Sequence, residues 1–407
     1  MPTNRQQIMR RFAARTRVAY IESPLPVVGS FIGRSRGRAR RHGWRVEDGV
    51  HVLQAWDWAP YPVTKRSKPL SRWMDRAFRA YVTRAWRELD WPRPIAWFYT
   101  PDGGDLLGAF DERLSVYHCV DDYQAIERYN HYRRVAIYSG LKEEHYLAAA
   151  VDLMLVSAPA LMDRWRGVNP HLTLMANVAD TALFSQALEP GPDHPKLAGI
   201  PTPRVVFIGA LDRYKVDFDL LGAVARMLPE VQFICIGPIG AADSTTGADT
   251  PRGPNLRYIG PLPHHELPAA LRYASAGIIP YRINDYTASV SPLKLYEYLA
   301  AGSPVVTTPL PGLLAQPDDG ALVAGPDPVA FAARLTEAIG FDTAARRRIS
   351  QRAAAHSWER RMEELESLLL GQLALRASAD LPGDAPGNAA VHKALARRER
   401  RYAQDPS

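Results

Sequence analysis

The 407-residue sequence has little cysteine, no long apolar run and no cluster of metal-ligating residues. Its two cysteines, Cys119 and Cys235, stand inside apolar strand-like runs, so we interpret both as reduced core residues from a reducing compartment. No segment approaches the roughly 20 apolar residues that a membrane-spanning helix needs. The N-terminus is basic but lacks the apolar stretch of a secretory signal. These absences argue against a disulfide scaffold and an integral membrane protein, and we expect a cytoplasmic protein.

Acidic residues are absent between Glu22 and Glu47, although the whole chain has 43 of them against 50 lysines and arginines. A basic segment fills this gap, with Arg34, Arg36, Arg38, Arg40, Arg41 and Arg45. Three interpretations stay open for it: a solvated basic face, a site for anionic lipid headgroups or a phosphorylated acceptor, and a nucleic-acid site. No DNA- or RNA-binding motif supports the third, so nucleic acid is not an expected partner.

Strand-like and helix-like segments alternate in both halves of the chain, and the Pro/Gly-rich stretch EPGPDHPKLAGIPTP separates the halves. This alternation indicates parallel sheets covered by helices on both faces. We therefore predict an α/β protein with two doubly wound Rossmann-like domains facing a cleft, where ligands bind beyond the carboxyl ends of the strands. The expected parts are an N-terminal domain at 1–190, a C-terminal domain at 200–355, a helix at 356–372 that packs back toward the first domain, and a partly disordered basic tail at 376–407.

The segment SVSPLKLYEYLAAGSPVV predicts a short helix that runs into a strand. We expect Ser291 to cap the helix, Pro292 to occupy its first turn and Gly302 to end it in a left-handed conformation. Lys294 and Glu297 lie three residues apart and therefore share a face. A lysine at a helix start suits a diphosphate, and a carboxylate can accept hydrogen bonds from both hydroxyls of a ribose. The alternative is an ordinary surface ion pair.

A second candidate region is FIGALDRYK, where Gly209 ends a strand and Arg213 and Lys215 follow. In a doubly wound sheet, this strand end and the helix start near Lys294 meet the same cleft. Arg213 and Lys215 could instead be ordinary surface charges. The Gly-rich fingerprint of dinucleotide-binding folds is absent after the first strand of either half, which argues against a standard dinucleotide enzyme.

These segments, with YIGPLPHHELPAALRYASAGIIPY and SPLKLYEYLAAGSPVVTTPLPGL, resemble the donor domain of GT-B glycosyltransferases. The resemblance is to the large bacterial, family 4-like group of retaining enzymes that use nucleotide sugars, in the branch of exopolysaccharide, O-antigen and teichuronic-acid pathways. Weaker matches at NRQQIMRRFAARTRVAYIE, VYHCVDDYQAI and NVADTALF extend it over most of residues 1–370. It implies an acceptor-side domain at 1–190 and a nucleotide-sugar donor domain at 200–355.

The resemblance also implies roles for single residues. Glu297 matches the ribose ligand and Lys215 the phosphate-binding lysine of the family. The usual arginine after the strand glycine is Ala210, so we expect Arg213 to substitute, and the usual first glutamate is Ser289. The complete predicted donor site comprises Gly209, Arg213, Lys215, Gly260, Ser289, Ser291, Pro292, Leu293, Lys294 and Glu297.

In the first domain, the sequence HCVDDY ends a strand on the cleft side. Asp121 is the first candidate for contact with the transferred sugar or the acceptor hydroxyl, and His118 is the second. The alternatives are that an aspartate here caps the next helix and that His118 is a core histidine. Asn177 matches the asparagine before the family's interdomain crossing.

The implied reaction moves a hexose-type sugar from a nucleoside diphosphate sugar to a lipid-linked or glycan acceptor. The donor phosphate would help take the acceptor proton, and Lys215, Arg213, Lys294 and helix amides would stabilise the leaving diphosphate, without cofactor or metal. The basic segment suggests peripheral docking at the inner face of the cytoplasmic membrane. Two alternatives remain, a GT-B nucleotide-sugar epimerase and a non-catalytic nucleotide-sugar-binding scaffold, the latter favoured by Ser289 and Ala210.

Overall fold

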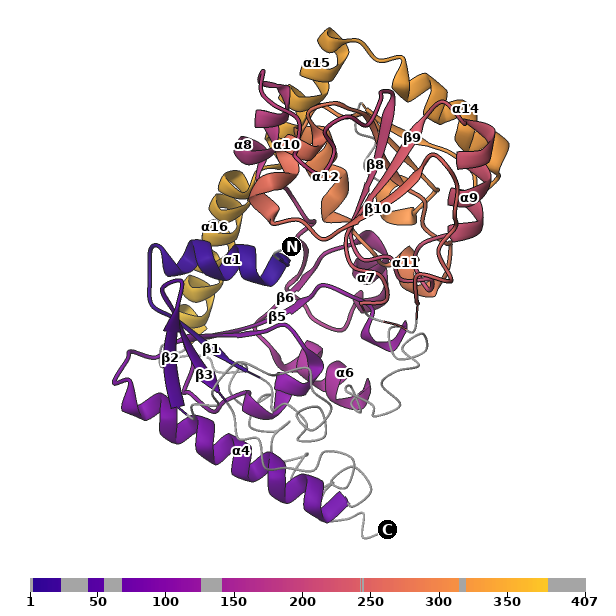
Figure 1. The fold of residues 1–407 in the computed structure, drawn as a ribbon. Coiled ribbons are helices and arrows are strands. Elements are labelled where there is room, and N and C mark those ends of the chain that lie inside the picture. The colour runs from indigo at the N-terminus through magenta and orange to yellow at the C-terminus, as the bar shows by residue number, and fades with distance from the viewer. Residues whose placement is uncertain are drawn as a thin grey trace.

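The chain forms two lobes that lie one above the other (Figure 1). The structure is a computed structural model that describes residues 3–22, 43–54, 68–125, 141–241, 243, 245–314 and 320–379. Of the predicted basic segment, only Arg45 falls in these ranges, and residues 380–407 of the predicted tail lie outside them.

Within the residues that the structure describes, the N-terminal lobe contains two small sheets. Four parallel strands are ordered β4 (Ile95–Phe98), β5 (Leu114–Cys119), β6 (Leu153–Val156) and β7 (Leu172–Leu174). Three more are ordered β1 (Val18–Ile21), β3 (Val50–Gln54) and β2 (Gly43–Glu47). The helical elements of this lobe are α1 (Asn4–Ala13), α4 (Lys68–Glu88), η1 (Pro101–Leu106), α6 (Leu141–Ala150) and α7 (Pro159–Trp165).

The three-stranded sheet departs from the predicted all-parallel arrangement, because β2 and β3 are antiparallel. Asp48 and Gly49 join them with φ angles of 49° and 78°. Two consecutive positive φ angles are typical of the tight hairpin turn that Asp-Gly favours.

In the described part of the C-terminal lobe, six strands form one parallel sheet. Their order is β10 (Leu256–Gly260), β9 (Gln232–Ile236), β8 (Arg204–Ile208), β11 (Ala274–Ile279), β12 (Val305–Thr307) and β13 (Ala321–Val323). The helical elements are α9 (Phe218–Met227), η4 (His264–Glu266), α10 (Leu267–Leu271), α11 (Asp285–Ala288), α12 (Leu293–Ala300), α13 (Pro311–Leu314), α14 (Pro328–Ile339) and α15 (Thr343–Ala353). The chain order reverses between β8 and β11, and ligands of doubly wound sheets bind beyond the strand ends at such a switch point.

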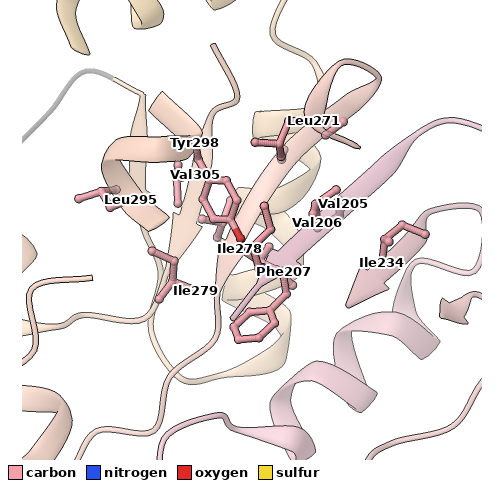
Figure 2. Close-up of a cluster of buried hydrophobic side chains, with 14 of the residues drawn as sticks. Val205, Val206, Phe207, Ile234, Leu271, Ile278, Ile279, Leu295, Tyr298 and Val305 are labelled. Carbon is pink, nitrogen blue, oxygen red and sulfur yellow. Dashed lines mark hydrogen bonds between the residues drawn. The ribbon is translucent and has the colours of Figure 1, made fainter. Parts of the chain in front are cut away.

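The core of this lobe fixes α12 against that switch point (Figure 2). Tyr298 of α12 is fully buried, and a Cβ on Gly277 of β11 would lie 2.5 Å from its ring, so the ring packs directly on the strand. The Tyr298 hydroxyl accepts a hydrogen bond of 2.6 Å from the backbone N–H of Ile208, at the end of β8. One side chain therefore holds the helix in register with both central strands.

Two segments join the lobes. Residues of α8 (Thr181–Phe184) and η3 (Ser185–Leu188) carry the chain from the lower lobe to the upper one, and α16 (Trp358–Ala379) returns it (Figure 1). In the return helix, Trp358, Met362, Leu365 and Leu369 are buried in one cluster with Ile8, Val116 and Leu155. Burial of these side chains ties α16 and α1 to the N-terminal sheet.

Candidate functional site

The amine of Lys294 lies at the switch point of the C-terminal sheet, beside Gly209. Lys294 Nζ donates a hydrogen bond of 2.8 Å to the hydroxyl of Tyr281, which follows β11, and lies 4.1 Å from the ring centroid of Phe207 on β8. A Cβ on Gly209, whose φ is +140°, would lie 2.6 Å from this amine. The glycine therefore leaves the strand end open where the lysine reaches it.

The surroundings of Lys294 disfavour a charged amine. Burial lowers the pKa of Lys294 well below its ordinary value, Lys215 lowers it further, and Glu297 and Asp212 act in the opposite direction. The hydrogen-bond acceptor of the amine is a phenol rather than a carboxylate. An anionic ligand would restore the charged form, because an opposite charge nearby favours it.

The structure brings Lys215 to this cluster but not Arg213. Lys215 Nζ lies 3.3 Å from a carboxylate oxygen of the fully buried Asp212, and its side chain is 15% exposed. The guanidinium of Arg213 pairs with Asp249 at 3.2 Å, and 61% of the Arg213 side chain is exposed. Arg213 thus points to a surface loop, and this geometry gives no support to its predicted substitution for the family arginine.

Glu297 lies one turn beyond Lys294 and is almost completely buried. One of its oxygens, Oε1, is 3.2 Å from Nε2 of His264, and Oε2 has no hydrogen-bond partner among the described residues. Lys294 and Glu297 are 7% and 5% exposed, so the alternative of a surface ion pair is wrong. The sequence pattern did not indicate His264, which is 33 residues away from its partner.

The start of α12 differs from the prediction by one residue. The helix begins at Leu293, Pro292 is the N-cap residue with φ −73° and ψ 118°, and no side chain caps the helix. The expectation that Ser291 caps it is therefore wrong, because Pro292 keeps an extended conformation. The carbonyl of Ser291 instead accepts a hydrogen bond of 2.6 Å from Asn177 Nδ2 of the N-terminal lobe. Asn4 Nδ2 of α1 donates a hydrogen bond of 2.6 Å to Oδ1 of the same Asn177, so three segments of the chain meet at the start of α12.

Ser289 and Gly260, the remaining predicted donor residues, lie before α12 and at the end of the edge strand β10, and Gly302 lies at the other end of α12. Gly302 has φ +67° and ends α12 as predicted. Ser289 is 7% exposed and follows α11. Gly260 ends β10 with φ +75° and has open space where a Cβ would lie.

Asp121 lies beyond β5 and faces the C-terminal lobe. The hydroxyl of Tyr286 on α11 donates to Asp121 Oδ1 at 3.4 Å, which connects the two lobes directly. Burial raises the pKa of Asp121 to about 6, against the lowering effects of Lys215 and Tyr286 and with a small raising effect of Asp122. The capping role belongs to Asp122, whose Oδ1 accepts from the backbone N–H of Ala125 at 3.0 Å.

His118 has a different position from Asp121, because it points into the packed interior. It is 0% exposed, and its ring centroid lies 6.0 Å from that of Trp97 and 5.2 Å from that of Tyr99. Neither ring nitrogen has a partner among the described residues, and burial lowers the pKa of His118 to about 3. This geometry favours the core-histidine interpretation.

The described part of the basic segment is internally paired. Arg45 on β2 contacts Glu22 at 2.7 Å and Glu47 at 2.9 Å. Among the described residues, no helix is both long and apolar enough to cross a membrane. Over the same residues, His, Cys, Asp and Glu side chains form no group of three or more that could hold a metal ion.

The architecture and several solved structures agree on the class of fold. Sucrose-phosphate synthase from Thermosynechococcus elongatus aligns with a TM-score of 0.63 at 16% identity, over 91% of this chain and 92% of that one. Anabaena HepE, solved with UDP and glucose, aligns with a TM-score of 0.59 at 13% identity, over 89% and 94%. The UDP-forming trehalose-phosphate synthase from Burkholderia xenovorans gives 0.58 at 14% identity, over 89% and 99%. The fold is GT-B, as the sequence predicted.

Sequence comparison finds relatives for part of the chain. Residues 202–340, within the C-terminal lobe, match the family described as glycosyl transferases group 1. The chain is also 33% identical over 166 residues to TuaH of Bacillus subtilis (strain 168), described as a teichuronic acid biosynthesis glycosyltransferase. That alignment covers 40% of this chain and 41% of the relative, less than half of either.

Proposed function

We propose that this protein is a glycosyltransferase that moves a hexose-type sugar from a nucleoside diphosphate sugar to a lipid-linked or glycan acceptor. The observation that carries the proposal is the convergence of Gly209, Lys215, Lys294 and Glu297 at the switch point of a group 1 glycosyltransferase domain. The likeness to TuaH supports surface polysaccharide synthesis as the pathway.

In this proposal, the diphosphate lies over Gly209 between the amines of Lys215 and Lys294. Glu297 is three residues further along α12, about 4.5 Å along the helix axis, and binds the ribose hydroxyls there. The two lysines stabilise the charge that develops on the leaving diphosphate, and the donor phosphate helps take the acceptor proton. Asp121 reaches the cleft from the other lobe, where it would contact the transferred sugar or the acceptor hydroxyl. The reaction needs neither metal nor cofactor and retains the anomeric configuration.

For a lipid-linked acceptor, we further propose that the enzyme docks at the inner face of the cytoplasmic membrane. The basic segment would bind anionic headgroups there, through arginines other than Arg45, which is already paired with two glutamates. Replacement of Arg34, Arg36, Arg38 and Arg40 by glutamate should abolish sedimentation with phosphatidylglycerol vesicles. Unchanged sedimentation would show that this segment is not the docking site.

The central test is a thermal-shift panel of UDP, GDP, ADP and CDP and their sugars. A ligand at 100 times its dissociation constant stabilises the folded state by about 2.7 kcal/mol, so the cognate base gives a clear shift. Glu297→Ala should remove most of this shift, because the buried carboxylate accepts the ribose hydrogen bonds. If no nucleotide shifts the wild-type transition, the proposal is wrong.

The scaffold alternative keeps one supporting feature, since Ser289 and Ala210 stand where the family has a glutamate and an arginine. A scaffold would bind the nucleotide sugar and release no nucleoside diphosphate when a bacterial lipid extract is added. An epimerase would convert the sugar without any acceptor. Analysis of products with and without the extract separates all three functions.

A further inference from the structure

The carboxylate of Glu297 is held by one neighbour and has unused hydrogen-bonding capacity. An ionised carboxylate offers about four acceptor positions, and in the described residues one of its oxygens contacts His264 at 3.2 Å while the other has no partner. The side chain of Glu297 is only 6% exposed. A buried carboxylate with open acceptor positions suits a ligand that donates hydroxyl hydrogen bonds.

The imidazole of His264 is itself fixed from two sides. His264 opens η4 directly after Pro263, whose φ of −55° and ψ of 144° set the direction of the turn. Its ring packs edge-on against Phe184, with 5.3 Å between centroids and 72° between planes. Phe184 is fully buried and ends α8, in the segment that connects the lobes. The imidazole therefore has little freedom to turn away from Glu297.

We infer that His264 is a positioning residue for ribose recognition: its Nε2–H holds one oxygen of Glu297, so that the remaining acceptor positions are oriented toward the sugar diol. The inference rests on the proposed function and adds a determinant that sets the preference for ribonucleotides. Without His264 the carboxylate could rotate about its last side-chain torsion, which is broad for Glu. Recognition of a hydroxyl by a fixed buried partner gives strong discrimination against an analogue that lacks it.

The test measures ribose preference rather than overall affinity. Isothermal titration gives the dissociation constants of the nucleoside diphosphate that binds the wild type and of its 2′,3′-dideoxy counterpart, which lacks both hydroxyls. We expect His264→Ala to weaken ribonucleotide binding about tenfold and dideoxynucleotide binding less than about twofold, since only the former uses the charged hydrogen bonds. His264→Gln should restore most of the preference, because its amide nitrogen can donate from nearly the same place.

Two controls separate positioning from a general structural effect. His265→Ala changes the adjacent histidine, whose side chain is 78% exposed, and should leave both constants unchanged. In a Glu297→Ala background, His264→Ala should not reduce the ribose preference any further. Circular dichroism melts check that each variant is folded.

The possible outcomes distinguish this inference from the proposed function. An equal loss for both nucleotides in His264→Ala, or no recovery in His264→Gln, overturns the positioning role. A wild type that binds ribo- and dideoxynucleotides equally also overturns it, although nucleotide binding then stands. A wild type that binds no nucleoside diphosphate removes the proposed function itself.

Discussion

Both lobes bury polar side chains near the ends of their parallel strands, but the hydrogen bonds of these side chains differ between the lobes. In the C-terminal lobe, Lys294 is bonded to Tyr281 and Glu297 to His264, so each charged group has a polar neighbour. In the N-terminal lobe, both ring nitrogens of His118 and the indole nitrogen of Trp97 lack partners within the described residues. The first arrangement holds ionisable groups of both signs with hydrogen-bonding capacity to spare. The second is an aromatic cluster around a neutral imidazole, which shows that burial of a polar group does not by itself indicate a ligand site.

The largest expected effect comes from removing the buried cation of the C-terminal cluster. Lys294→Met keeps the length of the side chain and should weaken nucleoside diphosphate binding about 10- to 100-fold, because a charge-assisted hydrogen bond to phosphate is lost. The same change should leave the free energy of unfolding unchanged or raise it, since a desolvated amine is replaced by a thioether. Titration calorimetry and urea unfolding measure the two quantities.

Lys196→Met is the matched control, because Lys196 belongs to the same lobe and its exposed amine donates a hydrogen bond of 3.3 Å to the backbone carbonyl of Ile259. It should change neither binding nor stability. If Lys294→Met lowered the free energy of unfolding and left the affinity for nucleoside diphosphate unchanged, Lys294 would be a structural residue of the core. Its burial would then have the same meaning as the burial of His118 in the other lobe.

The lowered pKa of Lys294 has a consequence for the pH dependence of binding. Above that pKa the free protein carries a neutral amine, and an anionic ligand favours its protonation, so binding takes up a proton and weakens as the pH rises. Calorimetry in buffers with different ionisation enthalpies should detect this uptake in the wild type and not in Lys294→Met. Equal uptake in both would assign the proton to another group.

A smaller effect is expected where the two lobes touch. The Tyr286 hydroxyl lowers the pKa of Asp121, which lies at about 6 in the intact protein, so Tyr286→Phe should raise that pKa. If ionised Asp121 supports the reaction, the acidic limb of the rate of nucleoside diphosphate release should move to higher pH. Tyr273→Phe is the control, because its hydroxyl bonds Gly191 at the surface. Identical pH profiles for wild type and Tyr286→Phe would contradict a role for this contact.

Local pattern was enough to predict two doubly wound α/β domains and to single out Gly209, Lys294 and Glu297 as candidates, because strand alternation and helix spacing place such residues at one sheet edge. The GT-B assignment and the expected roles of these residues came from the family resemblance. The pattern could not predict the contacts that bring these residues together. His264 and Tyr281 come from other strand ends, and Tyr286 meets Asp121 across 165 residues of sequence. No periodicity encodes such long-range pairs.

Two local errors have local causes. The sequence Asp48-Gly49 favours a β-hairpin, so the prediction of an all-parallel N-terminal lobe is wrong at β2 and β3. The capping of α12 by Ser291 failed because Pro292 stayed extended and became the N-cap itself. The Ser291 carbonyl instead accepts a hydrogen bond from Asn177, a contact between lobes that the local sequence does not reveal.

The smallest expected effect concerns the aromatic cluster of the N-terminal lobe. The pKa of His118 is about 3 in the folded protein and about 6.5 in the unfolded chain, so the unfolded state binds more protons between these values. His118 therefore costs stability as the pH falls below about 6.5, by at most about 1.4 kcal/mol per pH unit. His118→Phe should reduce this dependence in urea unfolding at pH 7 and pH 5, and leave nucleotide affinity unchanged. If His118→Phe instead weakened nucleotide binding and left the pH dependence of unfolding unchanged, His118 would belong to the ligand site. Buried polar groups of both lobes would then contribute to that site.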